Sequence, residues 1–187
     1  MRFTVLALIL AAALLASAQG LSNLPRASEV VKPRAYVSLE PVPRGRTFEI
    51  AVVAQIAPGF HINANKVFED YLIPTAIDAG PSGAAGFRVI ETVYPKGQLQ
   101  KFDFSEKMMN VYDGSVTLRL KAQALSDARL GNTSHTLTLR YQACNDRACL
   151  PPVRIPVPVE FVVADAGAKT KPANPEIFQK TKPSRKP

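Results

Sequence analysis

The sequence contains several short stretches in which apolar and polar residues alternate, and this period of two restricts the possible fold more than any other feature. In residues 153–163, six apolar side chains spaced two residues apart fall on one face of an extended chain. Similar stretches are residues 35–39, 47–56, 87–94, 116–122 and 136–141. Such a period is typical of strands with one buried face. Because proline or glycine separates the stretches, we expect an all-β chain that folds as a single β-sandwich.

Prolines refine this prediction in two places. Pro156 and Pro158 have no backbone N–H, and their spacing removes two donors from the same edge of the last stretch. We therefore expect residues 153–159 to lie at the edge of a sheet. Residues 70–79 are ambiguous, but Pro74 favours an interrupted strand there.

Two segments lack this alternation and are expected to be irregular. Residues 60–70 are mostly polar, with a phenylalanine near each end, and residues 98–110 contain Phe102, Phe104 and a Met-Met pair. Aromatic side chains in a loop need a reason, so they either fold back onto the core or cover something.

The first eighteen residues have the organisation of a secretory signal peptide. Arg2 precedes a long apolar run, and Ala16-Ser17-Ala18 is a small-residue cleavage site. We expect residues 1–18 to be a signal peptide, 19–34 a flexible leader, 35–163 the sandwich domain and 164–187 a disordered basic tail. No later stretch reaches the ~18 apolar residues that a membrane-spanning helix needs, so we expect a soluble, exported chain without a membrane span.

The positive charge is concentrated in the tail. Of the formal net charge of +8, half comes from residues 164–187, which hold six Lys or Arg and two acidic residues. A tail of this composition is typically solvated and disordered, and a weak tether to an anionic surface is the alternative. Because these charges lie in an aromatic-poor tail, we expect no binding of nucleic acid.

The chain has two cysteines, Cys144 and Cys149, in the segment YQACNDRACLPP between the last two predicted strands. A disulfide that closes a ring of about six residues stabilises by roughly 2 kcal/mol, against roughly 4–5 kcal/mol for a ring near a hundred residues. This small gain favours a pair that opens and closes over one that only holds the fold together. A static disulfide and a metal site remain the alternatives at this point.

A metal site has little support in the sequence. The two histidines, His61 and His135, are far from the cysteines in sequence, and no second paired-ligand motif is present. Met108 and Met109 offer soft sulfur ligands, but flexible residues that fill gaps in a core are the more common use of methionine. We expect neither a metal nor a cofactor.

Several motifs resemble the N-terminal periplasmic domain of the thiol–disulfide interchange protein DsbD. The most specific is Tyr141-Gln142-Ala143-Cys144 followed by Cys149-Leu150-Pro151-Pro152 and a valine-rich strand. Supporting motifs are Gly59-Phe60-His61-Ile62-Asn63, Leu72-Ile73-Pro74-Thr75, Tyr94-Pro95, Lys101-Phe102-Asp103-Phe104 and Val111-Tyr112-Asp113-Gly114. The resemblance spans residues 36–163.

This resemblance implies an immunoglobulin-like fold and a periplasmic protein-disulfide reductase that acts as an electron relay. The cysteine pair would receive two electrons from a thioredoxin-like donor and pass them to periplasmic disulfide-bearing proteins, such as disulfide isomerases or proteins of cytochrome c maturation. Because the chain ends soon after this domain, its donor would be another protein. We expect a monomer.

The resemblance also assigns roles to individual residues. Cys149 would form mixed disulfides with partners, and Cys144 would resolve them. Phe104 would be the centre of an aromatic cap loop that shields the pair, although ordinary core packing is an equal alternative. The remaining residues implied to line the site are Phe102, Asp103, His61, Asn63 and Tyr141, of which His61 could tune thiol acidity or simply be hydrogen-bonded.

The main rival from another class is a non-catalytic β-sandwich adaptor with a structural disulfide. In that hypothesis the basic tail binds the partner, and the cysteines only stabilise the fold. The loop between the cysteines is also slightly shorter than in the best-known members of the family.

Overall fold

The structure, a computed structural model, describes residues 24–83 and 86–179. The expected signal peptide and the last eight residues of the expected tail lie outside this part. Within the described residues, no helix is both long enough and apolar enough to cross a membrane.

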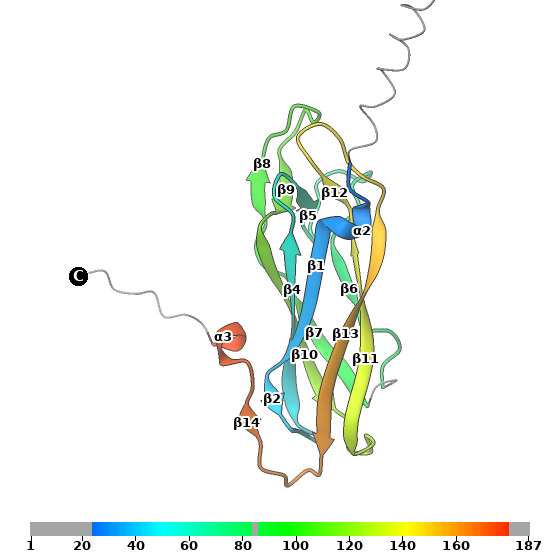
Figure 1. Ribbon diagram of the computed structural model, residues 1–187, viewed down its shortest axis with the longest axis vertical. Coiled ribbons are helices and arrows are strands. Elements are labelled where there is room, and N and C mark those ends of the chain that lie inside the picture. Colours follow the sequence, from blue (N-terminus) through cyan, green and yellow to red (C-terminus); the bar gives the residue numbers. More distant parts are fainter. Residues whose placement is uncertain (1–23, 84–85, 180–187) are drawn as a thin grey trace, which may run out of the picture.

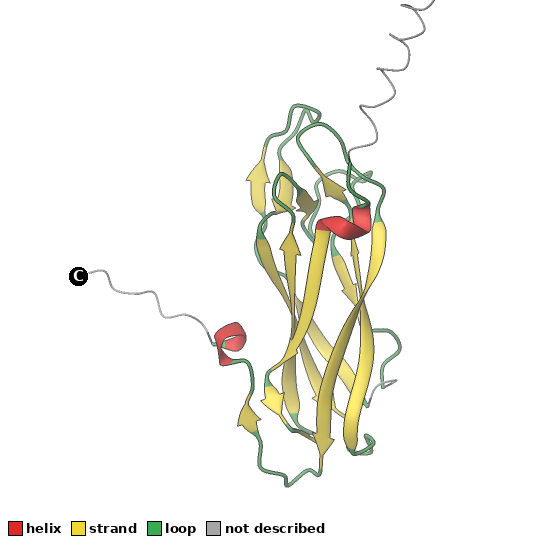
Figure 2. Cartoon of the chain, viewed as in Figure 1, coloured by secondary structure: helices red, strands yellow, loops and turns green. Residues whose placement is uncertain are grey.

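Two four-stranded sheets form an elongated sandwich (Figures 1 and 2). The first has the order β1 (Val31–Val37), β4 (Thr47–Ile56), β10 (Ser115–Ala124) and β7 (Phe87–Val93), with every pair antiparallel. The second has the order β3 (Val42–Pro43), β13 (Val153–Ala164), β11 (Gly131–Tyr141) and β6 (Ala76–Asp78). The prediction of an all-β sandwich is confirmed.

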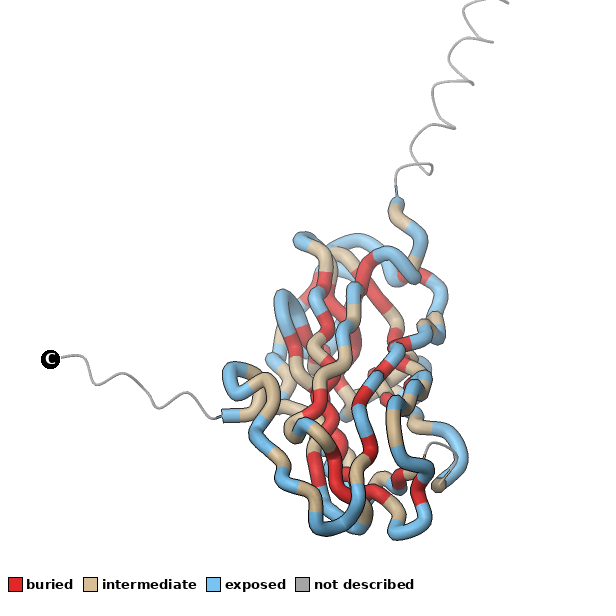
Figure 3. The backbone as a smooth tube through the Cα atoms, turned by 60° about the horizontal axis from the view of Figure 1, so that its bottom comes forward, coloured by how far each residue is buried: buried red, intermediate tan, exposed pale blue. Residues whose placement is uncertain are grey.

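The core lies between the two sheets and consists of the apolar faces read from the sequence (Figure 3). Alternate residues of each long strand are buried, including Phe48, Ile50, Val52, Leu118, Leu120, Leu137, Leu139, Val157 and Val159. Phe48, Phe87 and Phe161 meet with ring centroids 5.4–6.0 Å apart. Burial of these side chains contributes roughly 25 cal/mol for each Å² removed from water, which makes this interface the main source of stability.

The edge position predicted from Pro156 and Pro158 is confirmed. β13 pairs with β11 over its whole predicted length, with Pro156 opposite Thr138. On its other side β13 pairs with β3 only at Val163 and Ala164. The prolines therefore face an edge without a strand neighbour, where a missing N–H breaks no ladder bond.

A third, smaller sheet forms one end of the molecule. Its order is β12 (Ala143–Cys144), β5 (His61–Asn63), β9 (Met109–Tyr112) and β8 (Gln98–Gln100). The sequence analysis was wrong to treat two of these regions as wholly irregular. Strands of two to four residues are too short for a period of two to be recognised.

The N-terminal part of the sandwich begins earlier than expected. Helix α2 (Ala27–Val30) leads directly into β1, and Val30 and Val31 are buried in the core. The hydroxyl of Tyr141 donates a hydrogen bond of 2.6 Å to the carbonyl of Ala27, which fixes this segment to the end of β11. The expected domain start at residue 35 was therefore too late.

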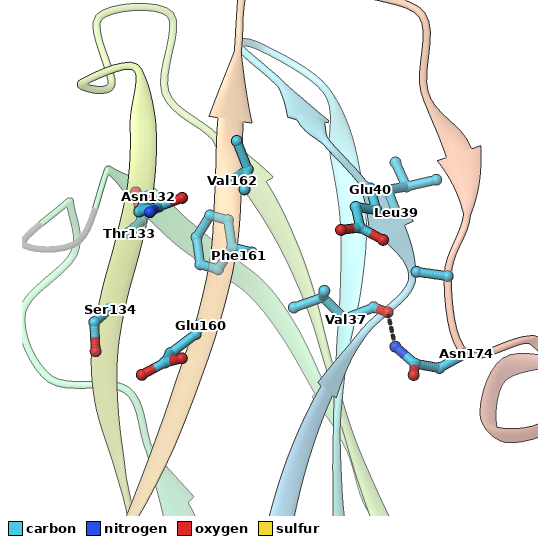
Figure 4. Close-up of a pocket in the computed structure, with 11 residues that line it drawn as sticks. Val37, Leu39, Glu40, Asn132, Thr133, Ser134, Glu160, Phe161, Val162 and Asn174 are labelled. Atoms are coloured by element: carbon cyan, nitrogen blue, oxygen red, sulfur yellow. Dashed lines mark hydrogen bonds between the residues drawn. The ribbon is translucent and has the colours of Figure 1, made fainter.

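The segment after β13 is ordered through Gln179, so the prediction of disorder from residue 164 onward was wrong there. β14 (Lys171–Pro172) pairs with β2 (Leu39–Glu40), and α3 (Pro175–Phe178) follows. Asn174 donates to the carbonyl of Val37 at 2.9 Å (Figure 4), and the Arg119 guanidinium lies 5.4 Å from the Phe178 ring centroid. These contacts depend on the fold of distant strands, so the composition of the tail alone did not reveal them. We call residues 165–179 the C-terminal strap.

Candidate active site

The two cysteines are joined by a disulfide with an S–S distance of 2.03 Å and a Cα–Cα distance of 3.9 Å. They face each other across a tight hairpin that follows β12. The flanking bonds run from the N–H of Asn145 to the carbonyl of Ala148, and from the N–H of Leu150 to the carbonyl of Ala143. This pattern puts the cysteines at a non-hydrogen-bonded pair, the position at which side chains of opposite residues come closest. The hairpin thus holds both sulfurs together.

Asn145 fixes the shape of the four-residue turn. Its side-chain oxygen accepts hydrogen bonds of 2.9 Å from the N–H groups of Arg147 and Ala148. Asparagine is favoured in turns for this ability to bond to the backbone just ahead of it. The turn conformation is therefore specified locally and does not depend on the disulfide alone.

The surroundings of the two cysteines differ sharply. Cys144 is completely buried, whereas Cys149 is exposed. An incoming thiolate needs access to the sulfur that it attacks, and this arrangement gives such access at Cys149. A thiolate at Cys144, by contrast, would form in a site from which water is largely excluded.

His61 on β5 lies directly opposite Cys144 on β12. Directly opposed residues of antiparallel strands project from the same face of the sheet, with Cβ atoms about 5 Å apart. The imidazole is only 4% exposed. The small sheet therefore brings the histidine predicted to line the site next to the buried cysteine.

Three aromatic rings are stacked on this face of the small sheet. The rings of His61 and Phe102 are 4.0 Å apart at an interplanar angle of 15°, and those of Phe102 and Phe104 are 5.6 Å apart at 15°. Phe102 is buried, whereas Phe104 at the outer end of the stack is 39% exposed. The predicted cap residues thus cover His61, and their shielding of the sulfurs stays a prediction.

The loop that carries Phe102 and Phe104 connects β8 to β9 and lies at the same end of the molecule as the cysteine hairpin (Figure 1). The Lys101 ammonium donates to the carbonyl of Ser105 at 2.5 Å, and Lys107 pairs with Glu69 at 2.8 Å. The hydrogen bond from Lys107 to Glu69 and the charge of that carboxylate raise the pKa of Lys107.

Below the loop, Phe102 joins a small apolar cluster that contains Leu72, Met109 and Val111. Met109 fills this cluster, as expected for a core methionine, whereas Met108 is exposed.

A cavity of about 520 Å³ opens beside His61 and is lined by Gln100, Phe102, Asp113 and Asp146 among others. Burial lowers the pKa of His61, and the nearby carboxylates of Asp146 and Asp113 partly oppose this shift. Gln98 and Gln100 donate hydrogen bonds of 3.2 and 3.1 Å to the Asp113 carboxylate. The imidazole is therefore neutral at neutral pH, while two negative charges lie on the cavity wall.

Asn63 is fully buried and links three segments around the site. Its Nδ2 donates to the carbonyl of Ile73 at 3.1 Å and to Oε1 of Gln142 at 3.2 Å. The same Gln142 oxygen accepts from the N–H of Ile73 at 3.3 Å. Sequence reasoning missed Gln142 as a site residue, although it lies within the quoted cysteine motif.

The other two residues predicted to line the site, Tyr141 and Asp103, have different surroundings from those of His61 and Asn63. Tyr141 is buried in the main core, and burial raises its pKa to about 12 while its hydroxyl bonds to Ala27. Asp103 is exposed next to Phe102. Tyr141 therefore fixes the α2 segment to β11, and its role in lining the cysteine site stays a prediction.

Among the residues that the structure describes, few other groups are placed for chemistry. In residues 24–83 and 86–179, no group of three or more His, Cys, Asp or Glu side chains could hold a metal ion. A separate hollow of about 570 Å³ is lined by residues of β1, β2, β11, β13 and the C-terminal strap (Figure 4). Its carboxylates are those of Glu40 and Glu160, and it contains neither cysteine nor histidine.

The fold and the site together define a β-sandwich domain with a small-ring disulfide on a hairpin at one end. The chain belongs to the family described as the N-terminal domain of the thiol:disulfide interchange protein DsbD, whose model matches residues 27–160. The expected family and its immunoglobulin-like fold are thereby confirmed. Membership supports a role in thiol–disulfide interchange.

Solved structures give weaker likenesses. The reduced N-terminal domain of Neisseria meningitidis DsbD is 19% identical with a TM-score of 0.42, and the match covers 80% of this chain and 94% of that one. The N-terminal periplasmic domain of Proteus mirabilis ScsB is 15% identical with a TM-score of 0.44, covering 69% and 44%. A comparison with curated protein sequences finds no match.

Proposed function

We propose that this protein is a periplasmic thiol–disulfide interchange module that relays two electrons through Cys144 and Cys149. A thioredoxin-like protein is the donor, and periplasmic proteins with disulfides are the recipients. Family membership supports the reaction class. The observation that carries the proposal is the contrast between an exposed Cys149 and a buried Cys144 within one disulfide.

Reduction of the pair proceeds in two exchanges. A donor thiolate attacks Sγ of Cys149, the bond between Cys149 and Cys144 breaks, and Cys144 leaves as a thiolate that takes up a proton. The second donor thiolate then attacks the donor sulfur of the mixed disulfide and releases Cys149. The donor ends as a disulfide, and the pair has gained two electrons.

Delivery to the recipient reverses these roles. The Cys149 thiolate attacks the recipient disulfide and forms a mixed disulfide while one recipient sulfur leaves. Cys144 then attacks Sγ of Cys149, closes the small ring again and releases the second recipient sulfur. Because the hairpin holds the two cysteines opposite each other, the resolving thiol is already within reach.

Replacement of the resolving cysteine tests this proposal. Cys144→Ser leaves the exposed Cys149 without its resolving partner, so we expect covalent adducts with periplasmic proteins on non-reducing gels. The matched variant Cys149→Ser keeps only the buried thiol and should yield few adducts. Equal adduct yields from the two variants, or a wild-type disulfide that thioredoxin-like proteins leave intact, would contradict the proposal and favour a structural disulfide.

A further inference from the structure

His61 has a buried nitrogen with no hydrogen-bond partner among the described residues. This atom is Nε2, and it is one of two buried side-chain polar atoms in that condition, the other being Oδ1 of Asn63. The ring of Phe102 covers one face of the imidazole at 4.0 Å. A buried polar atom without a partner costs free energy, so its presence calls for an explanation.

Opening of the disulfide changes the chemistry of the residue opposite His61. In the disulfide, the sulfur of Cys144 carries neither a proton nor a charge. Once the bond breaks, the same sulfur is a thiolate or a thiol, on the strand directly opposite His61. The reduced state therefore adds a group that can form a hydrogen bond beside a residue whose nitrogen lacks one.

Few groups near Cys144 can stabilise its thiolate, and the one cation in the turn between the cysteines, Arg147, is exposed to solvent. The residue is fully buried, and burial disfavours a charged sulfur. Asp113 and Asp146 line the adjacent cavity and add negative charge, and the ammonium of Lys101 bonds to the carbonyl of Ser105. Among the described residues that line the cavity, His61 alone can become a cation.

We propose that His61 carries the proton of Cys144 during disulfide exchange, an inference that rests on the proposed function. When an incoming thiolate bonds to Cys149, the sulfur of Cys144 departs with the electron pair of the broken S–S bond. The imidazole takes up, through the solvent, the proton that the incoming thiol lost on becoming a thiolate, and it then stabilises this sulfur and passes the proton to it. In the reverse step, the neutral imidazole removes the proton as Cys144 attacks Cys149.

The surroundings of His61 suit both directions of this transfer. Burial lowers the pKa of His61, which favours the neutral ring that accepts the proton of Cys144 in the closing step. A negative charge on the neighbouring sulfur favours the imidazolium, as do the carboxylates of Asp146 and Asp113. The pair of His61 and Cys144 then titrates as one coupled unit.

The rate of ring closure tests the proposal without any protein partner. Reduced protein is mixed with dithiobis-nitrobenzoate, which labels the exposed Cys149, and the attack of Cys144 then releases a second thionitrobenzoate that is followed by stopped-flow absorbance. We expect His61→Gln to slow this release at least about ten-fold at neutral pH. Because burial disfavours the Cys144 thiolate, the rate of the variant should keep rising beyond the ordinary thiol pKa of about 8.5, whereas the wild-type rate levels off at lower pH.

His135→Gln is the matched control. His135 lies on β11 with Nε2 at 2.8 Å from the carbonyl of Ala79, away from the cysteine hairpin. This variant should keep the wild-type rate and pH profile. A His61→Gln variant that folds and shows the same profile as the wild type would overturn the proposal.

A second measurement does not depend on folding of the variant. The wild-type chain has two histidines, so NMR can follow the imidazole of His61 in the disulfide and the reduced states. We expect the pKa of His61 to rise on reduction, and an unchanged His61 pKa would overturn the proposal. Both measurements use small reagents only. Failure of Cys149 to capture proteins would therefore count against the proposed function and leave this result standing.

Discussion

At the scale of single residues, the two cysteines of the disulfide differ in their exposure to solvent. Cys149 is exposed in the turn, and Cys144 is buried beside His61. The sequence revealed the pair, its small ring and the turn chemistry of the residues between them. It did not reveal which sulfur is accessible, because that depends on the strand that pairs with β12. Likewise, no local pattern marks Gln142, whose partners Asn63 and Ile73 are 79 and 69 residues away in sequence.

The first prediction at this scale concerns the turn. Asn145→Ala removes the acceptor of two backbone hydrogen bonds, so we expect a loss of about 1–2 kcal/mol in the free energy of unfolding. Urea denaturation of the oxidised protein measures this loss. Asp146→Ala, which changes the neighbouring exposed residue, is the control and should be nearly neutral. An equal effect of the two changes would show that the Asn145 side chain does not fix the turn.

At the scale of elements, very short strands build the site, and long strands position them. The long strands β4, β10, β11 and β13 were predictable because their alternation continues over six or more residues. By contrast, β5, β8, β9 and β12 have two to four residues and form only because the sandwich brings them together. Their pairing places the aromatic loop over His61, which the resemblance anticipated only as a cap near the cysteines.

Two substitutions in the loop between β8 and β9 distinguish a ring that shields the disulfide from a ring that packs in the apolar cluster. Phe102→Ala removes a buried ring from the small apolar cluster, so we expect a loss of about 3 kcal/mol in stability. Phe104→Ala removes a ring that is 39% exposed and should cost less than about 1 kcal/mol. If Phe104 shields the pair, its removal raises the rate at which dithiothreitol reduces the disulfide. An unchanged rate in a stable Phe104→Ala protein would exclude a cap role for that ring.

At the scale of the whole molecule, the site and the C-terminal strap are separate parts of the sandwich. The cysteine hairpin lies at one end (Figure 1), whereas the strap crosses near β1, β2 and β10. Composition predicted a disordered basic tail, but specific contacts hold residues 165–179 against the strands. Arg119 makes several of these contacts, since it donates to the carbonyl of Ile177 and lies over Phe178.

Removal of residues 166–187 tests this separation. Loss of the contacts made by Arg119, Asn174 and Thr170 should lower the free energy of unfolding by about 2–4 kcal/mol. The relay hypothesis predicts that Cys144→Ser in the shortened chain still forms the same covalent adducts. The adaptor hypothesis predicts that the partners are lost with the basic tail, even when the shortened protein is folded.

The reduction potential of the Cys144–Cys149 couple tests the central claim most directly. The oxidised protein would be equilibrated with defined ratios of reduced and oxidised thiols, and the dithiol fraction measured after alkylation. A protein that exchanges disulfides with thioredoxin-like donors should have a potential between about −120 and −270 mV. A value well below about −300 mV is characteristic of a structural disulfide and would contradict the account.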